Sequence, residues 1–424
     1  MRFDQLSGKR VGIFGMGVEG KSAVRILEKY TSYTTLVEIE ESSLSLLNTC
    51  DVLIKSPGVS LYRSEIQEFV KNGGLLTSGT NLFFANKRPE QQIIAVTGTK
   101  GKSTTSALMA HTLNCLNIPT ALGGNIGVPL LDLLDVPQNI CVAELSSYQC
   151  ADLSYDPDFG ILTNLYPEHL QWHGSHRQYF SDKLNMIRRS KKRLINIACP
   201  RVIELQKDLT DCLTFNDLKH IHVESDYFMD GSRQLFKISS LNLRGEHNAQ
   251  NACAVLSILS LFNIPLEHAE KPFSLFQALD HRLQVFHVSN DTRTYVDDSI
   301  STTPETAVAG LKAFDRGQFL TLIAGGLDRG QDYSVLIEYL RSVQDRCLLL
   351  TLPETGGRIS QCAKRSGIQN ISCLTMSQAV EKAKKYTPDD GLILLSPAAP
   401  SYNMYRNFKE RGKDFQRLAG VMTI

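Results

Sequence analysis

Short runs of β-branched and aliphatic residues alternate along the chain with longer stretches in which apolar residues recur every three or four positions. The short runs are typical of buried strands, and the longer stretches are typical of amphipathic helices. Their regular alternation predicts strand–helix–strand units that build parallel sheets. We therefore expect an α/β protein.

The pattern divides the chain into three blocks. The first opens with a strand at Val11–Gly15 and closes around the polar stretch FFANKRPEQQ, which reads as a linker containing Pro89. The second opens with a strand at Ile93–Thr97 and ends near Asp280–Arg282. The domains that this division predicts are 1–88, 89–280 and 281–424.

The third block begins with the alternating segments QVFHV and TYVDDS, which predict a hairpin across Ser289–Arg293. Further strands are expected near Leu320–Ala324, Cys347–Leu352 and Leu392–Leu395. The chain contains no internal repeat and no low-complexity tract. The whole length is therefore expected to fold into globular α/β domains.

Composition and charge narrow the possible partners and compartment. The 424 residues include 45 Lys and Arg against 44 Asp and Glu, and this balance gives no electrostatic case for a nucleic-acid or membrane partner. The N-terminal segment lacks a secretion-signal pattern, and no apolar run approaches the ~18 residues of a membrane span. Ten cysteines without a CxxC pair fit a reducing compartment. We expect a cytoplasmic protein.

The strongest single motif is a glycine loop between a buried strand and a helix, in the segment IIAVTGTKGKSTTSALMAHTLN. Backbone N–H groups of such a loop surround phosphate oxygens, a lysine reaches the terminal phosphates and a serine holds Mg²⁺. The strict GxxxxGK[ST] pattern is not met, because Val96 replaces its first glycine, and a turn without ligand is the alternative. The predicted ATP-binding residues are Gly98, Thr99, Lys100, Gly101, Lys102, Ser103 and Thr104.

A second glycine motif lies near the N-terminus. Gly15-Met16-Gly17-Val18-Glu-Gly20 fits GxGxxG after a strand, and Glu38 ends the next strand. Alone, this pattern suggests an NAD-dependent oxidoreductase. The ATP-type loop elsewhere in the chain favours a nucleotide-sugar instead, because any nucleotide diphosphate can bind at such a helix end. A tight turn without ligand is the remaining alternative.

A series of short motifs occurs in one order over nearly the whole chain. Each is weak alone, but their order and spacing are specific; they are KSPGV, VTGTKGKST, GGNIG, ELSSYQ, Pro-Glu-His followed by DKL, GEHNAQNA, DHR, DDSISTT, AGGLDRGQDY and LSPAAPS…FKERG. In these motifs the chain resembles the ATP-dependent Mur ligases. The final SPA…S…F..RG pattern resembles the members of that family that add glutamate.

The resemblance implies a Rossmann-like N-terminal domain for the nucleotide-sugar, a central P-loop ATPase domain and a Rossmann-like C-terminal domain for the amino acid. It further implies a monomer that forms an acyl phosphate in peptidoglycan precursor synthesis, with UDP-N-acetylmuramoyl-L-alanine and glutamate as substrates. Two departures, Ile300 for a lysine and Asn403 for an aspartate, lie around the expected amino-acid pocket. D-glutamate is the enantiomer we expect, with L-glutamate as the alternative.

The resemblance also implies two Mg²⁺ ions. Ser103 and Glu144 are expected to hold the first, although a strand-end glutamate alone is often a helix cap or ion-pair partner. His169 and Lys183 match the second site, where the family's lysine is carbamylated by carbon dioxide. By sequence alone, Lys183 reads as a solvated lysine and His169 as a structural histidine. The predicted catalytic residues are Lys102, His169 and Lys183.

The remaining predicted contacts follow from the resemblance. Adenine and ATP are expected to meet Asn248, Asn251, Arg282 and Asp298, which read singly as helix caps or surface charges. The nucleotide-sugar residues are Gly15, Met16, Gly17, Val18, Glu38, Ser56, Pro57, Gly58, Asn125 and Gln149. Among them, the Ser56-Pro57-Gly58 loop is expected to face the uridine, and Asn125 and Gln149 are expected to contact the muramoyl–alanine arm. The glutamate residues are Thr302, Arg329, Ser401 and Phe408, of which Phe408 alone would more often be core.

Two other readings stay open. One is another Mur-type ligase that joins a different amino acid to a different carboxylate. The other is a non-catalytic nucleotide-binding module, which the presence of Lys102, Ser103, Glu144, His169 and Lys183 disfavours. The oxidoreductase reading leaves the ATP-type loop and the C-terminal SPAAPS segment unexplained.

Overall fold

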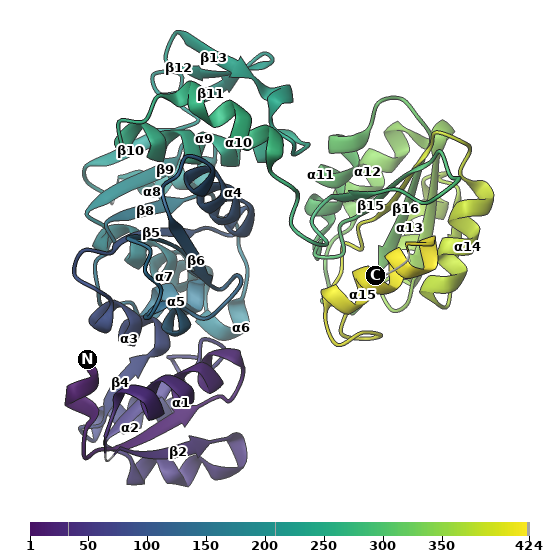
Figure 1. Ribbon diagram of the computed structural model, residues 1–424. Helices are drawn as coiled ribbons and strands as arrows, with labels where there is room; N and C mark the ends of the chain where they lie inside the picture. Colours follow the sequence, from purple (N-terminus) through teal and green to yellow (C-terminus); the bar gives the residue numbers. More distant parts are fainter. Residues whose placement is uncertain (33, 208, 422–424) are drawn as a thin grey trace. The chain divides into compact units, whose positions relative to one another are not determined.

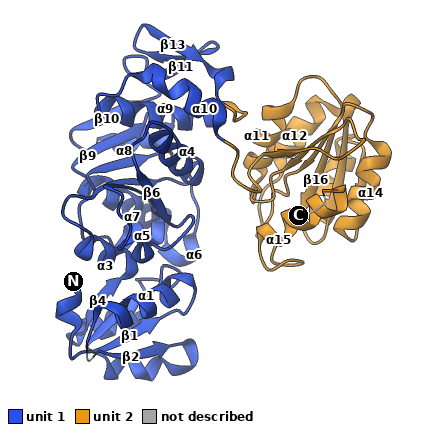
Figure 2. Cartoon of the chain, viewed as in Figure 1, with its two compact units in different colours: residues 1–241, 247–276 blue, residues 242–246, 277–424 orange. Residues whose placement is uncertain are grey.

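The computed structural model describes residues 1–32, 34–207 and 209–421, and it is an α/β structure with several mostly parallel sheets (Figure 1). The α/β fold class expected from the sequence is confirmed. Contacts divide the chain into two compact units, residues 1–241 with 247–276 and residues 242–246 with 277–424 (Figure 2). A boundary at residue 88 stays a prediction.

The N-terminal sheet is parallel, with strand order β2-β1-β3-β4. Its strands are β1 (Arg10–Phe14), β2 (Thr35–Ile39), β3 (Val52–Lys55) and β4 (Leu75–Ser78). The helical segments around it are η1 (Phe3–Leu6), α1 (Val18–Tyr30), η2 (Glu41–Thr49), α2 (Ser64–Lys71) and α3 (Gly79–Asn86). The predicted first strand is confirmed as β1.

The second sheet has six parallel strands in the order β10-β9-β8-β5-β7-β6. Its strands are β5 (Gln92–Thr97), β6 (Thr120–Gly124), β7 (Ile140–Glu144), β8 (Phe159–Leu162), β9 (Lys192–Asn196) and β10 (Cys212–Phe215). The helical segments that follow them are α4 (Lys102–Cys115), η3 (Leu130–Leu133), α5 (Ser147–Asp152), α6 (Leu170–His173), α7 (His176–Arg189) and α8 (Pro200–Gln206).

A small antiparallel sheet, which the sequence analysis does not anticipate, follows the parallel one. Its strands are β11 (Ile221–Glu224), β12 (Tyr227–Asp230) and β13 (Arg233–Lys237). The helical segments after it are η4 (Ile238–Ser240), α9 (Glu246–Leu261), η5 (Leu266–Ala269) and α10 (Glu270–Leu275).

The linker predicted at FFANKRPEQQ is wrong for its first four residues. Phe83 and Phe84 belong to α3, and both are buried in a hydrophobic cluster. The same cluster contains Ile13 of the N-terminal sheet and Ala95 of the six-stranded sheet. Burying two phenylalanines removes a large apolar area from water, so this segment joins the two sheets through one continuous core.

The sheet of the second unit has the order β14-β15-β19-β16-β17-β18. The predicted hairpin is confirmed, since β14 pairs antiparallel with β15, and the other pairs are parallel. The strands are β14 (Gln284–Phe286), β15 (Thr294–Asp297), β16 (Leu320–Gly325), β17 (Cys347–Leu352), β18 (Asn370–Ser372) and β19 (Leu392–Leu395). The helical segments are α11 (Pro304–Phe314), α12 (Ser334–Ser342), η6 (Gln344–Arg346), α13 (Gly356–Arg365), α14 (Met376–Tyr386) and α15 (Phe408–Ala419).

Side chains on the central strands of this sheet alternate between two buried clusters. Leu322 and Leu394 belong to one cluster, and their neighbours Ile323 and Leu395 belong to the other. A strand that is apolar on both faces is typical of a sheet covered by helices on both sides. Within the described residues, we find no helix with the length and hydropathy of a membrane span.

Candidate active site

The phosphate loop connects β5 to α4, as the motif predicts. Gly98 has φ 149° and Gly101 has φ 81°, and both values are unfavourable for residues with side chains. A Cβ atom at Gly98 would lie 1.9 Å from Thr163 Oγ1, and one at Gly101 would lie 2.5 Å from Asn251 Oδ1. Both the backbone conformation and the close neighbours therefore require glycine at these two positions.

The segment that follows β8 holds the loop in place. Thr99 N donates to Asn164 O at 3.0 Å, and Lys100 N donates to Asn164 Oδ1 at 2.8 Å. Thr163 Oγ1 donates to the carbonyl of Lys100 at 2.7 Å. Two N–H groups of the loop therefore already donate to Asn164. An anion would bind instead at the positive end of α4, where Lys102 and Ser103 begin the helix.

Two lysines converge on one carbonyl of the loop. Lys102 Nζ donates to Gly98 O and to Thr99 O, each at 3.0 Å, and Lys183 Nζ donates to Gly98 O at 2.7 Å. Lys183 is 2% exposed, so the reading of a solvated lysine is wrong. Burial, and then the charge of Lys102, lower the pKa of Lys183 to about 7.

Glu144 ends β7 beside β5 and is fully buried. Its Oε1 accepts a hydrogen bond from Asn125 Nδ2 at 2.7 Å, while its Oε2 is buried without a hydrogen-bond partner. A buried carboxylate oxygen without a donor is costly unless a cation satisfies it. Glu144 therefore fits the carboxylate of a Mg²⁺ site, together with the hydroxyl of Ser103.

No group of three His, Cys, Asp or Glu side chains within residues 1–32, 34–207 and 209–421 forms a metal cluster. Mg²⁺ is commonly held by one or two carboxylates together with substrate phosphates rather than by a complete protein cage. The donor set of Ser103 and Glu144 is consistent with that kind of site, where a nucleotide completes the coordination.

His169 follows Glu168 at the start of α6 in a left-handed conformation, φ 55°. Its side chain is 45% exposed, which does not fit a buried structural histidine. Burial lowers the pKa of His169 to about 4, against the opposing effect of Glu168, so its imidazole is neutral near pH 7. A neutral imidazole is the form that ligates metals. Glu168 in turn pairs with Lys100 of the loop.

The two asparagines predicted to read adenine lie near the start of α9, and both are 7% exposed. Asn251 Nδ2 donates to Asn248 Oδ1 at 3.5 Å, and the amide of Asn251 is the group that would collide with a side chain at Gly101. The structure therefore brings this pair beside the phosphate loop. Their contact with adenine stays a prediction.

The nucleotide-sugar residues of the N-terminal sheet gather at the carboxyl ends of neighbouring strands. Gly15 follows β1, Glu38 lies in β2 and Ser56 follows β3. Ser56 Oγ donates to Gly15 O at 2.5 Å, and a Cβ atom at Gly20 would lie 2.2 Å from the same carbonyl. The carboxyl edge of a parallel sheet is the usual ligand edge of such folds. The other members of this group are Met16, Gly17 and Val18 at the start of α1, with Pro57 and Gly58 after β3.

Gln149, predicted to contact the muramoyl–alanine arm, is held on both sides. Its Oε1 accepts from Ser146 N at 2.9 Å, which closes a capping box at the start of α5. Its Nε2 donates to Glu19 Oε1 at 3.3 Å. Burial, with a smaller effect from Asp132, raises the pKa of Glu19 to about 7. The sequence analysis does not identify Glu19 as a neighbour of this site.

The four predicted glutamate residues lie after three adjacent strands of the second unit. Thr302 follows β15, Arg329 follows β16, and Ser401 and Phe408 follow β19. Gln331 Nε2 donates to Thr302 O at 3.0 Å, which joins two of these segments. Arg329 is exposed, whereas Ser401 is 3% exposed. Their role in binding glutamate stays a prediction.

Arg282 and Asp298 also lie in the second unit. Asp298 is not a surface charge, because it is 6% exposed and accepts from Ser396 Oγ at 2.8 Å. Burial raises the pKa of Asp298 to about 7, against the opposing hydrogen bond from Ser396. Asn403 is one of the two departures from the family pattern, and its Nδ2 donates to Pro353 O at 2.7 Å. The predicted contacts of Arg282 and Asp298 with ATP stay predictions.

Sequence reasoning misses a buried arginine in the second unit. Arg411 is 1% exposed, and its Nη2 donates to Ser299 O at 2.7 Å and to Ala399 O at 3.1 Å. Its Nη1 is buried without an acceptor. These carbonyls belong to the segments that carry Thr302 and Ser401. The FKERG motif contained Arg411, but spacing alone does not indicate a buried guanidinium.

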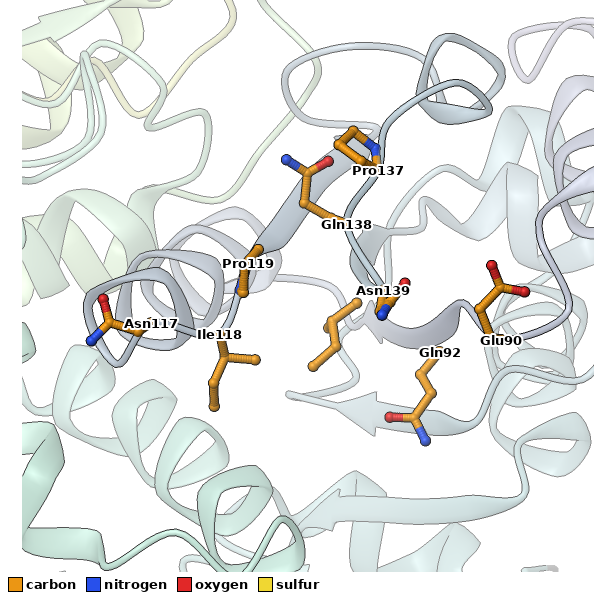
Figure 3. A pocket seen from close by; sticks show the side chains of 9 residues that line it. Glu90, Gln92, Asn117, Ile118, Pro119, Pro137, Gln138 and Asn139 are labelled. Atoms are coloured by element: carbon orange, nitrogen blue, oxygen red, sulfur yellow. The ribbon is translucent and has the colours of Figure 1, made fainter.

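The structure also has an open hollow of about 400 Å³ at the other end of the six-stranded sheet (Figure 3). Gln92 and Ile140, at the beginnings of β5 and β7, line it with Glu90 and Asn139. Ligands of parallel sheets bind at the carboxyl ends of the strands. The hollow lies at the opposite ends of β5 and β7, and it contains none of the predicted site residues.

Comparison with known families and sequences gives a consistent result. The family model described as the Mur ligase middle domain matches residues 96–259, which include the phosphate loop, Glu144, His169 and Lys183. A Micromonospora protein named UDP-N-acetylmuramoyl-L-alanine--L-glutamate ligase is 35% identical, over 98% of this chain and 97% of its own length. A Xanthomonas oryzae pv. oryzae protein of the same name is 35% identical, over 99% of this chain and 97% of its own.

Solved structures share the fold. The UDP-N-acetylmuramate-alanine ligase MurC of Thermotoga maritima matches with a TM-score of 0.63 and 19% identity, over 96% of this chain and 98% of that one. The MurF ligase of the same organism, solved in complex with ADP, matches with a TM-score of 0.61 and 13% identity, over 96% and 93% of the two chains. With relatives of this identity along nearly its full length, the chain belongs to the Mur ligase family, whose members are ATP-dependent, ADP-forming amide ligases.

Proposed function

We propose that this enzyme joins L-glutamate to UDP-N-acetylmuramoyl-L-alanine, with ATP cleaved to ADP and phosphate. The observation that carries the proposal is the convergence of Lys102 and Lys183 on the carbonyl of Gly98, at the carboxyl ends of the strands that also present Glu144. The reaction brings a carboxylate and a triphosphate together. Lys102 and the positive end of α4 hold positive charge at their meeting point, and this charge reduces the repulsion between them.

The first step transfers the terminal phosphoryl group of ATP to the carboxylate of the alanine residue. The bond between that phosphorus and ADP breaks, and a bond to a carboxylate oxygen forms, which gives an acyl phosphate. Lys102 and the positive end of α4 bind the phosphate oxygens and balance their charge. When bound, Mg²⁺ held by Ser103 and Glu144 would supply further charge neutralisation.

The second step forms the amide bond. The glutamate amine bonds to the acyl carbon, the bond to the phosphate oxygen breaks, and the amine loses a proton. Phosphate therefore leaves with one oxygen that began in the alanine carboxylate. In the second unit, Thr302, Arg329, Ser401 and Phe408 would hold the incoming glutamate, and the guanidinium of Arg329 suits a carboxylate.

Carbamylation of Lys183 is part of the proposal. A neutral amine attacks carbon dioxide, and the product is a carbamate with release of one proton. With a pKa lowered to about 7, Lys183 supplies a large neutral fraction near neutral pH, unlike an ordinary lysine. The carbamate and neutral His169 together would provide oxygen and nitrogen ligands for a second Mg²⁺.

The names of the relatives support L-glutamate as the enantiomer. The sequence analysis favours D-glutamate, whereas the curated relatives at 34–35% identity are named for L-glutamate. The departures Ile300 and Asn403 lie in the segments after β15 and β19, which carry Thr302 and Ser401. These two departures lie where a change of enantiomer would be accommodated, and the preference for L-glutamate itself rests on the relatives' names.

The test is phosphate release by the purified enzyme with ATP, Mg²⁺ and UDP-N-acetylmuramoyl-L-alanine. We expect L-glutamate to stimulate release and D-glutamate to give at most a small fraction of that rate. Stimulation by D-glutamate alone would restore the sequence-based preference. If neither enantiomer stimulates release, the proposed amino acid is wrong. Isotope-labelled carboxylate oxygen must also appear in the released phosphate.

A further inference from the structure

The chain's single tryptophan lies between the predicted uridine loop and the predicted metal ligands. Trp172 Nε1 donates to Pro57 O at 3.1 Å, and Ser60 Oγ donates to Trp172 O at 2.8 Å. Pro57 belongs to the loop between β3 and α2, residues 56–63, which begins with Ser56-Pro57-Gly58, and Trp172 lies on α6, three residues after His169. Two hydrogen bonds of opposite direction therefore fix this loop against α6.

A second connection leads from the same loop to α7. Tyr62 OH donates to Asp182 Oδ1 at 2.6 Å, and Gln178 Nε2 donates to the same oxygen at 2.8 Å. The ring of Tyr62 meets the ring of Trp172 edge-on, with centroids 5.7 Å apart. Asp182 is 4% exposed and immediately precedes Lys183. The loop thus contacts the residue next to the predicted carbamylated lysine.

The connection continues from Asp182 into the catalytic segments. Asp182 Oδ2 lies 2.5 Å from His173 Nδ1, and His173 Nε2 lies 2.9 Å from Ser147 Oγ. With Asp182 accepting from Nδ1–H, the other ring nitrogen accepts from the hydroxyl of Ser147. His173 and Ser147 are each 3% exposed. This Ser–His–Asp chain joins three helices. Helix α5 carries Gln149, α6 begins directly after His169, and α7 carries Lys183.

We propose that Tyr62 and Trp172, through Asp182 and His173, form a positioning bridge that sets the distance between the uridine loop and the reacting carboxylate. The proposal rests on the proposed function, in which one nucleotide-sugar spans from this loop to the phosphate loop. Such a substrate is held at its uridine end while its other end must meet ATP. A bridge that fixes the two binding regions relative to each other places the carboxylate correctly.

The effect of the bridge on kcat and on UDP affinity distinguishes it from a contact that only stabilises the fold. Uridine diphosphate alone needs the residues at the carboxyl ends of the N-terminal strands, which include the loop. The reaction also needs the metal ligands to lie at the correct distance from that loop. Weakening the bridge should therefore lower kcat with the whole nucleotide-sugar and leave the affinity for UDP unchanged. Because Trp172 is the chain's sole tryptophan and bonds to the loop, we choose its emission to follow UDP binding.

The variant Tyr62→Phe removes the hydroxyl but keeps the ring against Trp172. We expect kcat with UDP-N-acetylmuramoyl-L-alanine to fall about 10-fold, since small misplacements of a reacting group have effects of this size. The Kd for UDP from Trp172 emission and the KM for ATP should match those of the unaltered enzyme. The variant Trp172→Phe, which loses the N–H donor to Pro57, should show the same loss of kcat.

Tyr30→Phe is the matched control. Tyr30 OH also contacts a carboxylate, that of Asp135, between α1 and the segment after η3, but it lies outside the bridge. We expect normal kinetics from this variant. The proposal is overturned if Tyr62→Phe keeps full kcat, if Tyr30→Phe loses as much, or if Tyr62→Phe weakens UDP binding as much as it lowers kcat. Failure of the unaltered enzyme to release phosphate with either glutamate would instead refute the proposed function.

Discussion

Within the residues that the structure describes, each of the two compact units buries one cation without a carboxylate bound to it: Lys183 in the first unit and Arg411 in the second. Both are held by backbone carbonyls. Burial lowers the pKa of Lys183 to about 7 and that of Arg411 to about 10. The amine is therefore partly neutral near pH 7, while the guanidinium stays protonated.

Because their protonation states differ near pH 7, Lys183 and Arg411 have different roles. An amine that loses its proton becomes a nucleophile and can be carbamylated. A guanidinium keeps its charge and its fixed set of donors, so it holds carbonyl oxygens in place. Arg411 accordingly ties together the segments that carry Thr302 and Ser401, whereas Lys183 lies at the phosphate loop itself.

The largest effect is expected from Lys183→Ala. Losing the predicted carbamate ligand beside the phosphate loop should lower kcat by about 100-fold or more. Bicarbonate should raise the activity of the unaltered enzyme in carbon-dioxide-depleted buffer and have no effect on the variant. Arg188→Ala, an exposed position on the same helix, is the control and should stay active. Full activity of Lys183→Ala would end the proposed catalytic role.

The next effect is on stability. Arg411→Met keeps an unbranched apolar stem but removes the guanidinium, and so leaves the carbonyls of Ser299 and Ala399 without their donor. We expect the free energy of unfolding to fall by about 2 kcal/mol or more, measured by chemical denaturation. Arg411→Lys should recover only part of the loss, because one ammonium cannot reproduce the fork. A Met variant as stable as the unaltered protein would show that Arg411 does not organise these segments.

The smallest expected effect is a pH dependence of the free energy of unfolding that arises from Lys183. The pKa of Lys183 is about 7 in the folded state and near its ordinary 10.5 in the unfolded state. Between these values the unfolded chain binds more protons, so stability rises with pH; below about 7 the cost of burial is complete. Relative to Lys183→Met, the unaltered protein should gain about 2 kcal/mol from about pH 7 to pH 9, in carbon-dioxide-free buffer. An unchanging difference between the two proteins across this range would place the pKa of Lys183 elsewhere.

Local patterns predicted the individual elements well. The four apolar residues Leu392–Leu395 form β19 with the expected ends, and the strand–glycine–helix order of the phosphate loop is present. The linker predicted at FFANKRPEQQ was wrong in its first half. The polar second half suggested an exposed segment, but Phe83 and Phe84 are buried between the sheets. Alternation and glycine spacing are local properties, so a sequence reveals them; burial against a distant sheet is not local.

The bridge shows the same limit in the candidate site. Tyr62, Ser147 and His173 lie far apart along the chain, and none belongs to a motif that suggests their contact. Lys183 reads as solvated within a charged segment, yet it is buried. A single sequence reports residue types and spacing, but which of them face each other depends on how the helices pack.

By itself, the sequence determined the parallel α/β organisation, the phosphate loop and the membership of a ligase family, because these depend on periodicity and on ordered short motifs. Tertiary structure alone decided that Lys183 is buried beside Lys102, that Glu144 keeps an oxygen without a donor, and that Arg411 holds two carbonyls. The reason is physical: desolvation and electrostatic coupling arise only when distant segments pack together and exclude water.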